Sequence, residues 1–344
     1  MKYCILGAGR TAQGMVAYLS QRGQQAGIWD RSQEKRSLLR ECGIKMEGQC
    51  EGSYQPIVVD SLEEAAAQAE VLLIMTTAEG HMPLASGLSG HLRKGQMILI
   101  LNGNMGAWEF WSILQEEIKE KGVLLAETGG MLLLCDYNEN GHLFLKSIKK
   151  EMNLAAIPSS ATAEMIHQLS AEFPQFYSVG SVVETSLNNS NPIIHAPVTL
   201  FNFTRTENGE NYNFYADGAT ACVVSFIEQA DKERCAVIQA MGATPIPCVD
   251  IINSFWPRKF DCLLDAIRQN NAYMTGKGPR TLAYRYITED IPFGIVPLID
   301  LGKQFAVPTP CLEAMLTCYH ALLGNTFPSK SPNVQGFAQV IHEM

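Results

Sequence analysis

Two segments of the sequence carry side chains that could move protons and hold a carboxylate. In the first, His195 follows Asn191 and Pro192. Proline suits the first position of a helix and the asparagine before it suits the N-cap, so His195 would be the fourth helical residue. The positive end of the helix dipole disfavours imidazolium there, and a histidine that stays neutral near pH 7 can act as an acid or a base. Taken alone, His195 is equally well explained as a helix-start residue bonded to a nearby carbonyl.

The second segment, residues 284–292, combines a guanidinium with acidic side chains. Arg285 could hold a carboxylate through a two-pronged hydrogen bond. Asp290 could accept a hydrogen bond from one nitrogen of His195, which would fix the tautomer and stabilise the protonated ring. On the spacing alone, a simpler interpretation is favoured, in which residues 288–290 cap a helix and Arg285 forms a surface ion pair.

A glycine-rich turn is the strongest local motif. It reads Gly7-Ala8-Gly9-Arg10-Thr11-Ala12, directly after an apolar run and at the start of a helical pattern. Gly7 permits the tight turn, Gly9 lets the backbone approach a pyrophosphate, and Ala12 lets the helix pack closely on the sheet. The phosphates would lie at the positive end of that helix, with Arg10 and Thr11 beside them.

An acidic residue follows this turn at the spacing of a dinucleotide site. Asp30, about twenty residues on, ends a second predicted strand and could accept hydrogen bonds from the adenosine ribose. Its carboxylate repels a 2′-phosphate and so favours NAD. Arg31, beside it, could pair with that phosphate or stack on adenine, so NADP stays open. A structural glycine turn with Asp30 as a helix cap is the competing interpretation.

Polar side chains at two further strand ends should border the cofactor, because ligands of such sheets bind beyond the carboxyl ends of the strands. They are Thr76, Thr77 and Asn102. Their hydroxyls and amide could bond the phosphates or ribose, although polar residues are common in such loops.

The first 180 residues alternate short apolar runs with helix-length stretches. Strands separated by helices imply parallel pairing through right-handed crossovers, so we expect a Rossmann-type α/β domain. Strands are predicted at 2–6, 26–29, 56–59, 71–75, 97–101 and 123–126, and helices at 10–22, 32–40, 62–69 (capped by Ser61) and 163–172. Short β-like pieces at 131–134, 143–148 and 154–157, around a turn at 138–141, could extend the same sheet.

A mostly α-helical domain is expected from residue 181 to residue 344. Its clearest helical segments are 219–241 and 311–323. The chain of 344 residues is long enough for two domains, and 47% hydrophobic with 18% charged residues suits two ordinary cores.

Composition and charge exclude several classes of protein. A net charge of −9 argues against a nucleic-acid binder. The ten cysteines form no CxxC pair and no zinc-type spacing with histidine, so we expect no metal and reduced thiols. The apolar run at the N-terminus is too short for a signal peptide or a membrane span. We therefore expect a cytoplasmic monomer or homodimer that binds no membrane.

The two catalytic segments resemble the octopine/nopaline (opine) dehydrogenase family. Asn-Pro-x-x-His at 191–195 and Arg-Tyr-x-x-Glu-Asp-x-Pro at 285–292 carry the resemblance, and the order of the domains matches. The resemblance spans nearly the whole chain and is weaker at 127–128 and 102–110. It implies that His195 and Asp290 form a catalytic dyad, that Asn191 lies at the active site, and that Arg285 binds a substrate carboxylate.

One departure concerns a wall of the substrate cleft. After Glu127-Thr128, members of the family tend to have Leu-Pro-Tyr, whereas this chain has Gly129-Gly130-Met131.

The resemblance implies a reductive condensation with NAD or NADP as cofactor. An amino acid and a 2-oxo acid such as pyruvate would form an imine, and reduction would give a secondary-amine dicarboxylate. Two alternatives remain. One is a dehydrogenase that reduces a simple oxo acid or ketose phosphate without an amine, with Lys232 or Lys277 as the acid. The other is a catalytically silent NAD-binding protein, since a fold alone names no reaction.

Overall fold

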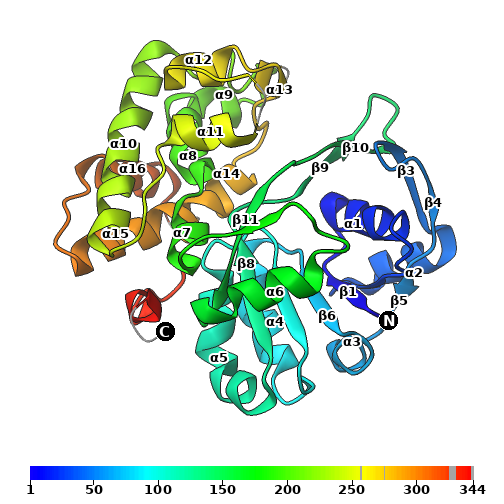
Figure 1. Ribbon diagram of the computed structural model, residues 1–344. Coiled ribbons are helices and arrows are strands. Elements are labelled where there is room, and N and C mark those ends of the chain that lie inside the picture. The colour runs from blue at the N-terminus through cyan, green and yellow to red at the C-terminus, as the bar shows by residue number, and fades with distance from the viewer. Residues whose placement is uncertain (256–257, 275, 325–330, 342–344) are drawn as a thin grey trace. The chain divides into compact units, whose positions relative to one another are not determined.

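The structure is a computed structural model that describes residues 1–255, 258–274, 276–324 and 331–341. The chain divides into two compact units, Met1–Ser186 and Leu187–Ile341, and each has its own elements and buried core (Figure 1). The sequence-based domain boundary near residue 180 stays a prediction. No helix among the described residues is long and apolar enough to cross a membrane.

An eight-stranded sheet forms the centre of the first unit, in the order β12-β11-β8-β7-β6-β1-β2-β5. All neighbours in it run parallel except β8 and β11. The strands are β1 (Tyr3–Leu6), β2 (Gly27–Trp29), β5 (Ile57–Val58), β6 (Val71–Ile74), β7 (Met97–Ile100), β8 (Leu124–Thr128), β11 (Met152–Ile157) and β12 (Phe176–Ser178). The predicted parallel α/β arrangement is confirmed. Strands β1, β6 and β7 are buried along their whole length, as their unbroken apolar sequences require.

Helices connect these strands and cover the sheet. They are α1 (Arg10–Ser20), α2 (Gln33–Cys42), α3 (Leu62–Gln68), η1 (Ala78–Gly80), α4 (His81–Leu88), α5 (Gly106–Lys121), η2 (Ser159–Ala161), α6 (Thr162–Leu169) and α7 (Val182–Leu187). The predicted cap of α3 is present, because the hydroxyl of Ser61 accepts a hydrogen bond from the backbone N–H of Glu64 at 3.0 Å.

A second, four-stranded sheet was not predicted. Its order is β4-β3-β10-β9, with β3 (Ile44–Gly48), β4 (Gly52–Tyr54), β9 (Leu133–Tyr137) and β10 (Leu143–Ile148). The expectation that residues 131–157 extend the main sheet is therefore wrong for β9 and β10 and correct only for β11. The physical reason lies in α1, which is buried on nearly every side and needs a second layer against it. A Cβ added to Gly14 of α1 would come within 3.0 Å of Cys135 on β9.

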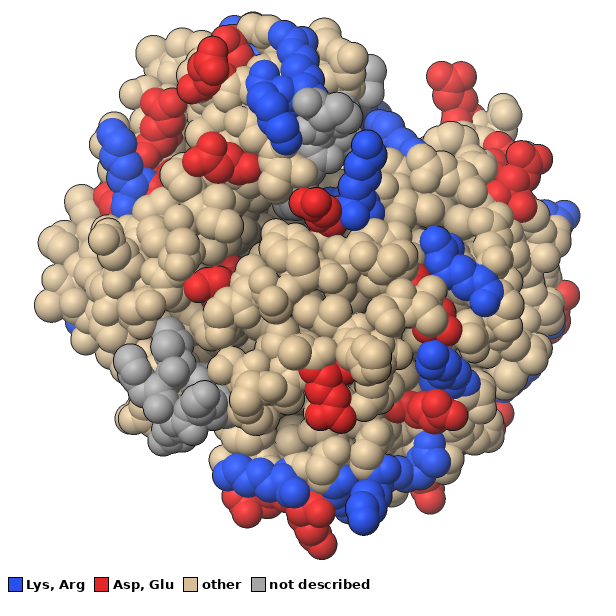
Figure 2. All heavy atoms as spheres, viewed as in Figure 1, with Lys and Arg blue, Asp and Glu red and all other residues tan. Residues whose placement is uncertain are grey.

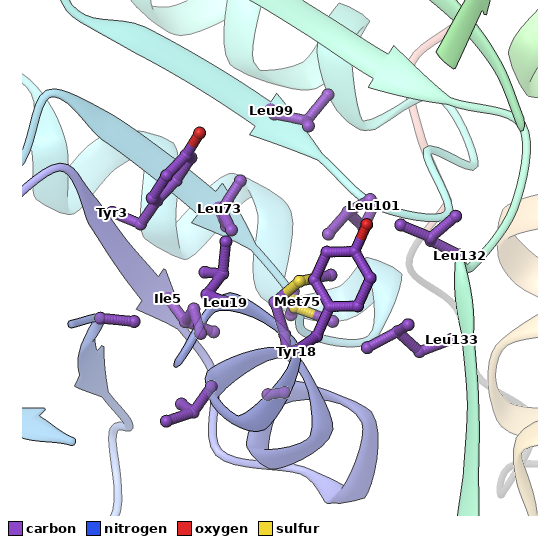
Figure 3. Close-up of a cluster of buried hydrophobic side chains, with 14 of the residues drawn as sticks. Tyr3, Ile5, Tyr18, Leu19, Leu73, Met75, Leu99, Leu101, Leu132 and Leu133 are labelled. Atoms are coloured by element: carbon purple, nitrogen blue, oxygen red, sulfur yellow. The ribbon is translucent and has the colours of Figure 1, made fainter. Parts of the chain in front are cut away.

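One apolar cluster joins the two sheets and α1. Figure 3 shows Tyr18 of α1 gathered with Leu101, Leu132 and Leu133, all of them almost fully buried. Burial of each large apolar side chain contributes about 1.5–3 kcal/mol, so this cluster holds the layers together. It also fixes the carboxyl ends of the main-sheet strands, where the predicted cofactor residues lie.

The second unit is helical. Its elements are α8 (Ser190–Phe201), α9 (Phe203–Glu207), α10 (Ala221–Ala240), α11 (Cys248–Phe255), α12 (Leu263–Arg268), α13 (Asn271–Met274), α14 (Arg285–Thr288), the π-helical segment η3 (Ile291–Ile295), α15 (Val296–Gln304), α16 (Pro310–Leu323) and η5 (Phe337–Ile341). The helices predicted at 219–241 and 311–323 are confirmed as α10 and α16. Helix α8 is almost entirely buried and packs against α10, α14, α16 and η3.

Acidic and basic side chains are interspersed on the face that Figure 2 shows. This pattern agrees with the mixed charges and net acidity of the sequence.

Candidate active site

A buried histidine–aspartate pair lies in the second unit. Nδ1 of His195, on α8, is 2.7 Å from Oδ2 of Asp290, which immediately precedes η3. Both side chains are buried, with 6% of His195 and 2% of Asp290 exposed. The two residues are 95 positions apart in the chain. The contact that the sequence suggested is therefore present, and it can fix the tautomer of the imidazole.

The start of α8 differs from the prediction. The N-cap is Asn189, whose side-chain oxygen accepts a hydrogen bond from the backbone N–H of Asn191 at 3.0 Å. Asn191 is therefore a helical residue in the first turn, and His195 is the sixth residue of α8 rather than the fourth. Because the effect of the helix dipole falls off within the first turn, it does not account for the protonation of His195.

Burial, and not the helix dipole, keeps His195 neutral. It lowers the pKa of His195, and the positive charge of Arg285 lowers it further, while Asp290 raises it through its charge and its hydrogen bond. The net direction is downward, so the imidazole is neutral at pH 7. Nδ1–H then donates to Asp290, and Nε2 is left as an acceptor.

Tyr215 occupies that second nitrogen and was missed in the sequence. Its hydroxyl lies 2.9 Å from Nε2 of His195 and donates to it. The ring of Tyr286 stacks on the imidazole, with centroids 4.0 Å apart, and Phe214 meets it edge-on. The aromatic runs at 212–215 and 284–286 were a signal, but no spacing rule joins residues that lie about 70 positions apart.

A short bridge holds the Tyr215 segment in place. The backbone N–H of Phe214 donates to the carbonyl of Gly276 at 2.7 Å, and that of Gly278 donates to the carbonyl of Tyr212 at 2.9 Å. The ammonium of Lys277, a candidate acid in the alternative mechanism, donates to the side chain of Asn213 at 3.0 Å. Lys277 thus supports this loop, and Lys232, the other candidate, is exposed on α10.

A close contact between η3 and α8 fixes the position of Asp290 relative to α8. A Cβ added to Gly294 of η3 would come within 3.0 Å of the ring of Pro192 on α8. Only glycine lets the two backbones approach this closely. The π-helical turn at η3 is a feature often found at functional sites, and here it directly follows Asp290.

A buried arginine anchors the chain just before α8. Arg234 of α10 is 0% exposed and donates to the carbonyl of Leu187, to the side chain of Asn188 and to Asp231 at 2.8–3.0 Å. A fully bonded polar network of this kind fixes one arrangement of the segments that it joins.

Arg285 lies at the surface and pairs with Glu289. Its side chain is 44% exposed, and its Nε lies 3.6 Å from a carboxylate oxygen of Glu289. The surface ion pair that the sequence suggested is therefore present. Exposure leaves the guanidinium able to bind a further carboxylate, which would be a charge-assisted contact.

In the first unit, the glycine-rich turn fits a dinucleotide. Gly7 has φ +123°, and a Cβ there would come within 3.0 Å of the carbonyl of Met75, so only glycine suits this position. Gly9 is the N-cap of α1, and a Cβ there would meet nothing within 4 Å. The space above Gly9 is open at the positive end of a helix, as a pyrophosphate requires. Ala12 is buried.

Asp30, the predicted ribose ligand, holds this turn in place. One carboxylate oxygen accepts from the backbone N–H of Ala8 and the other from that of Ser32, each at 2.9 Å. The ammonium of Lys35 lies 3.7 Å from the same carboxylate. Asp30 is 8% exposed, so its substitution would disturb the turn itself.

The remaining predicted cofactor residues lie around the turn and at a strand end. Arg31 is exposed, and Thr11 is half-buried in the first turn of α1. The guanidinium of Arg10 pairs with Asp136 of β9. Thr76 and Thr77 follow β6, the first half-buried and the second exposed.

Asn102 begins a loop of strained backbone. The backbone φ values of Asn102, Asn104 and Met105 are 67°, 43° and 65°, in a region that residues other than glycine rarely adopt. Such strain persists only where the surroundings enforce it, and it is common at ligand sites. The enforcing group is buried Glu127, which accepts hydrogen bonds from the backbone of Ala107 and from the hydroxyls of Thr185 and Ser186. Burial raises the pKa of Glu127.

The departure at Gly129-Gly130 has a structural counterpart. A Cβ on Gly129 would come within 3.0 Å of the side chain of Asn153, and one on Gly130 would lie 3.3 Å from Nζ of Lys149. These two polar side chains occupy the space where larger residues at 129 and 130 would extend. Burial lowers the pKa of Lys149 to about 8.

A second buried histidine lies in the first unit. His81 is 1% exposed, and its Nδ1 lies 3.3 Å from Glu109. Its imidazole packs against Gly106 at the start of α5, where a Cβ would come within 3.0 Å of it. Among the described residues, no group of three or more potential ligands could hold a metal ion.

Comparison with protein families identifies the second unit. Residues 178–323 match the model for the α-helical domain of NAD/NADP octopine/nopaline dehydrogenases. The chain is 31% identical to an opine dehydrogenase of Arthrobacter sp. (strain 1C), over 94% of this chain and 91% of that protein. It is 22% identical to a vitopine synthase of Allorhizobium ampelinum, over 92% of this chain and 89% of that protein.

Solved structures support the fold. An octopine dehydrogenase in complex with NADH and agmatine matches with a TM-score of 0.78 at 16% identity, over 94% of this chain and 90% of that one. A yersinopine dehydrogenase with NADP+ bound matches with a TM-score of 0.75 at 14% identity, over 100% of this chain and 98% of that one.

Proposed function

Because this chain belongs to the opine dehydrogenase family, we propose that it joins an amino acid to a 2-oxo acid such as pyruvate and reduces the resulting imine. Enzymes of this family are NAD(P)-dependent oxidoreductases that act on CH–NH bonds, and this chain is one of them. The product would be a secondary-amine dicarboxylate. Solved octopine dehydrogenases with pyruvate or L-arginine bound support these substrate classes.

The observation that carries the proposal is the buried contact between His195 and Asp290. Imine formation needs a base that takes a proton from the amine and an acid that protonates the departing hydroxyl. A neutral imidazole can do both in turn, and the carboxylate of Asp290 stabilises the imidazolium that exists in between. The exposed guanidinium of Arg285 would hold the carboxylate of the oxo acid and so orient its carbonyl.

The first unit would hold the nicotinamide cofactor, which supplies the hydride when bound. The pyrophosphate would lie against Gly7 and Gly9 with Arg10, Thr11 and Ala12 behind it, and Asp30 and Arg31 would meet the adenosine ribose. Thr76, Thr77 and Asn102 would border the other half of the cofactor.

A screen of NADH and NADPH oxidation tests the proposal. Amino acids are paired with pyruvate and other 2-oxo acids, and each oxo acid is also tested alone. We expect oxidation that requires both substrates, and a fall of about 10²–10⁴-fold in kcat for His195→Ala. The exposed His91→Ala is the matched control and should keep the wild-type rate.

Turnover of an oxo acid without an amine would instead favour simple carbonyl reduction. Tight cofactor binding with no turnover of any pair would favour a silent binding protein.

A further inference from the structure

His195 offers no open nitrogen to a substrate. Nδ1 is bound to Asp290 at 2.7 Å and Nε2 to the hydroxyl of Tyr215 at 2.9 Å. One face of the ring lies against Tyr286, and Phe214 covers an edge. His195 as a whole is 6% exposed. A proton that leaves or reaches Nε2 must therefore pass through the phenolic oxygen of Tyr215, unless that side chain moves away.

The surroundings of Tyr215 keep it in place. Its ring stacks on Tyr273, with centroids 4.6 Å apart, and meets Phe214 edge-on at 5.0 Å. The bridge from Asn213 to Lys277 pins the backbone beside it. A side chain held on two sides and bonded at its tip is more costly to displace than a free surface tyrosine.

Tyr215 is more accessible than the histidine behind it. The residue is half-buried, whereas His195 and Asp290 are buried. The three side chains are hydrogen-bonded in the sequence Tyr215, His195, Asp290, and Tyr215 is the most exposed residue of the three, as a proton relay needs.

We propose that Tyr215 is a catalytic residue that passes protons between the substrate and His195. This proposal rests on the proposed function, because it assigns the group that contacts the reacting amine and hydroxyl. The dyad then acts through the phenol instead of directly.

The steps balance with one shuttled proton. The substrate ammonium gives a proton to the oxygen of Tyr215 while the hydroxyl proton of Tyr215 passes to Nε2 of His195, leaving a free amine and an imidazolium. The amine attacks the carbonyl carbon, and its second proton ends on the oxygen. Nε2 of the imidazolium then returns its proton to the oxygen of Tyr215, while the hydroxyl proton of Tyr215 passes to the carbinolamine hydroxyl. The C–O bond breaks and water leaves, and the nitrogen lone pair forms the C=N bond.

The charge states allow this exchange. Burial raises the pKa of Tyr215 well above its usual value, and Tyr286, Tyr273 and Asp290 raise it further, while Arg285 lowers it. Tyr215 therefore stays a neutral phenol, which can donate and accept at the same moment. A free phenolate is not required at any step.

Tyr215→Phe tests the relay, because it keeps the ring and removes the hydroxyl. We expect kcat with an amino acid and oxo acid to fall at least about tenfold, with the Kd for NADH within about twofold of the wild type. Nitrogen-15 NMR of His195 should show a shifted Nε2 signal, because its hydrogen bond is lost. Tyr212→Phe removes another buried hydroxyl of the same segment, which lies 3.3 Å from Thr206, and should keep the wild-type kcat.

A second variant separates chemistry from packing. Tyr215→Ala leaves a space that added phenol or toluene can fill. We expect phenol to restore activity and toluene not to. Equal restoration by toluene, no restoration by phenol, or a kcat of Tyr215→Phe within about twofold of the wild type would each overturn the relay. Failure of the proposed function is distinct, since the wild type itself would then not turn over.

Discussion

At the scale of single residues, opposing influences set the charge of His195, the proposed acid and base. Burial and Arg285 lower the pKa of His195, and Asp290 raises it. The carboxylate therefore keeps the histidine basic enough to take a proton from the amine while burial keeps it neutral at rest. Removal of either influence should change the pH at which the enzyme works.

Asp290→Asn removes the raising influence. The pKa of His195 should fall further, so the acid limb of the profile of kcat/KM against pH should move to lower pH, because activity is lost only where the ring becomes protonated. At pH 7 kcat should fall about 10²–10⁴-fold, since the imidazolium formed in the reaction loses its partner. A limb that moves to higher pH would contradict this account. Asp300→Asn, at a partly exposed position of α15, is the control.

The sequence could supply His195, Asp290 and Arg285 because they lie in two short segments with recognisable spacing. It could not supply Tyr215, since the loop that carries it is placed by a bridge to residues 276–278. It also gave no sign that His81 is buried, because nothing in the local pattern shows that Gly106 leaves space for an imidazole.

At the scale of elements, the contact between η3 and α8 positions the dyad. The backbone of Gly294 lies directly against Pro192, three residues before His195. A single methyl group at this contact must separate the two elements, and the separation acts on the distance from Asp290 to His195.

Gly294→Ala should therefore cost about 1–3 kcal/mol of stability and reduce kcat by a larger factor than the stability loss explains. Gly302→Ala of α15 is the control, because its Cβ would also come within 3.0 Å of a neighbour, here Thr309 at the N-cap of α16, in a contact that involves neither α8 nor η3. Thermal unfolding and kcat measured on both variants check this. Equal falls in kcat would count against the positioning role of the contact.

The elements also show which parts of the fold a pattern can predict. Runs such as residues 71–74 and 97–100 are strands in both the prediction and the structure, because burial on both faces demands unbroken apolar sequence. The second sheet was not predicted, because β3 and β10 pair across about 100 intervening residues and no local signal marks that partner.

At the scale of the whole molecule, cofactor binding should stabilise the first unit. A ligand that binds only the folded state at 100 times its Kd adds about 2.7 kcal/mol, which for a unit of 186 residues corresponds to a rise in Tm of about 5–10 °C. Gly9→Val should abolish this rise and leave the Tm without NADH unchanged, because the space above Gly9 is open.

Gly7→Val is the contrasting variant. It should lower the Tm even without NADH, because φ is +123° and the carbonyl of Met75 blocks a side chain. Thermal unfolding with and without NADH distinguishes the two glycines. If the Tm of Gly9→Val still rises with NADH, the glycine-rich turn is not part of the binding site.

The layer that covers α1 also bears on how the protein is made. The helix ends at Ser20, and β3 and β4 at residues 44–54 contact it, but β9 and β10, which complete the four-stranded sheet against it, begin at Leu133 and end at Ile148. During synthesis, more than a hundred residues must therefore leave the ribosome after α1 before the sheet that buries its apolar outer face is complete. The apolar face of α1 therefore stays partly exposed in the nascent chain for several seconds, and we expect chaperones to act on the chain during that time.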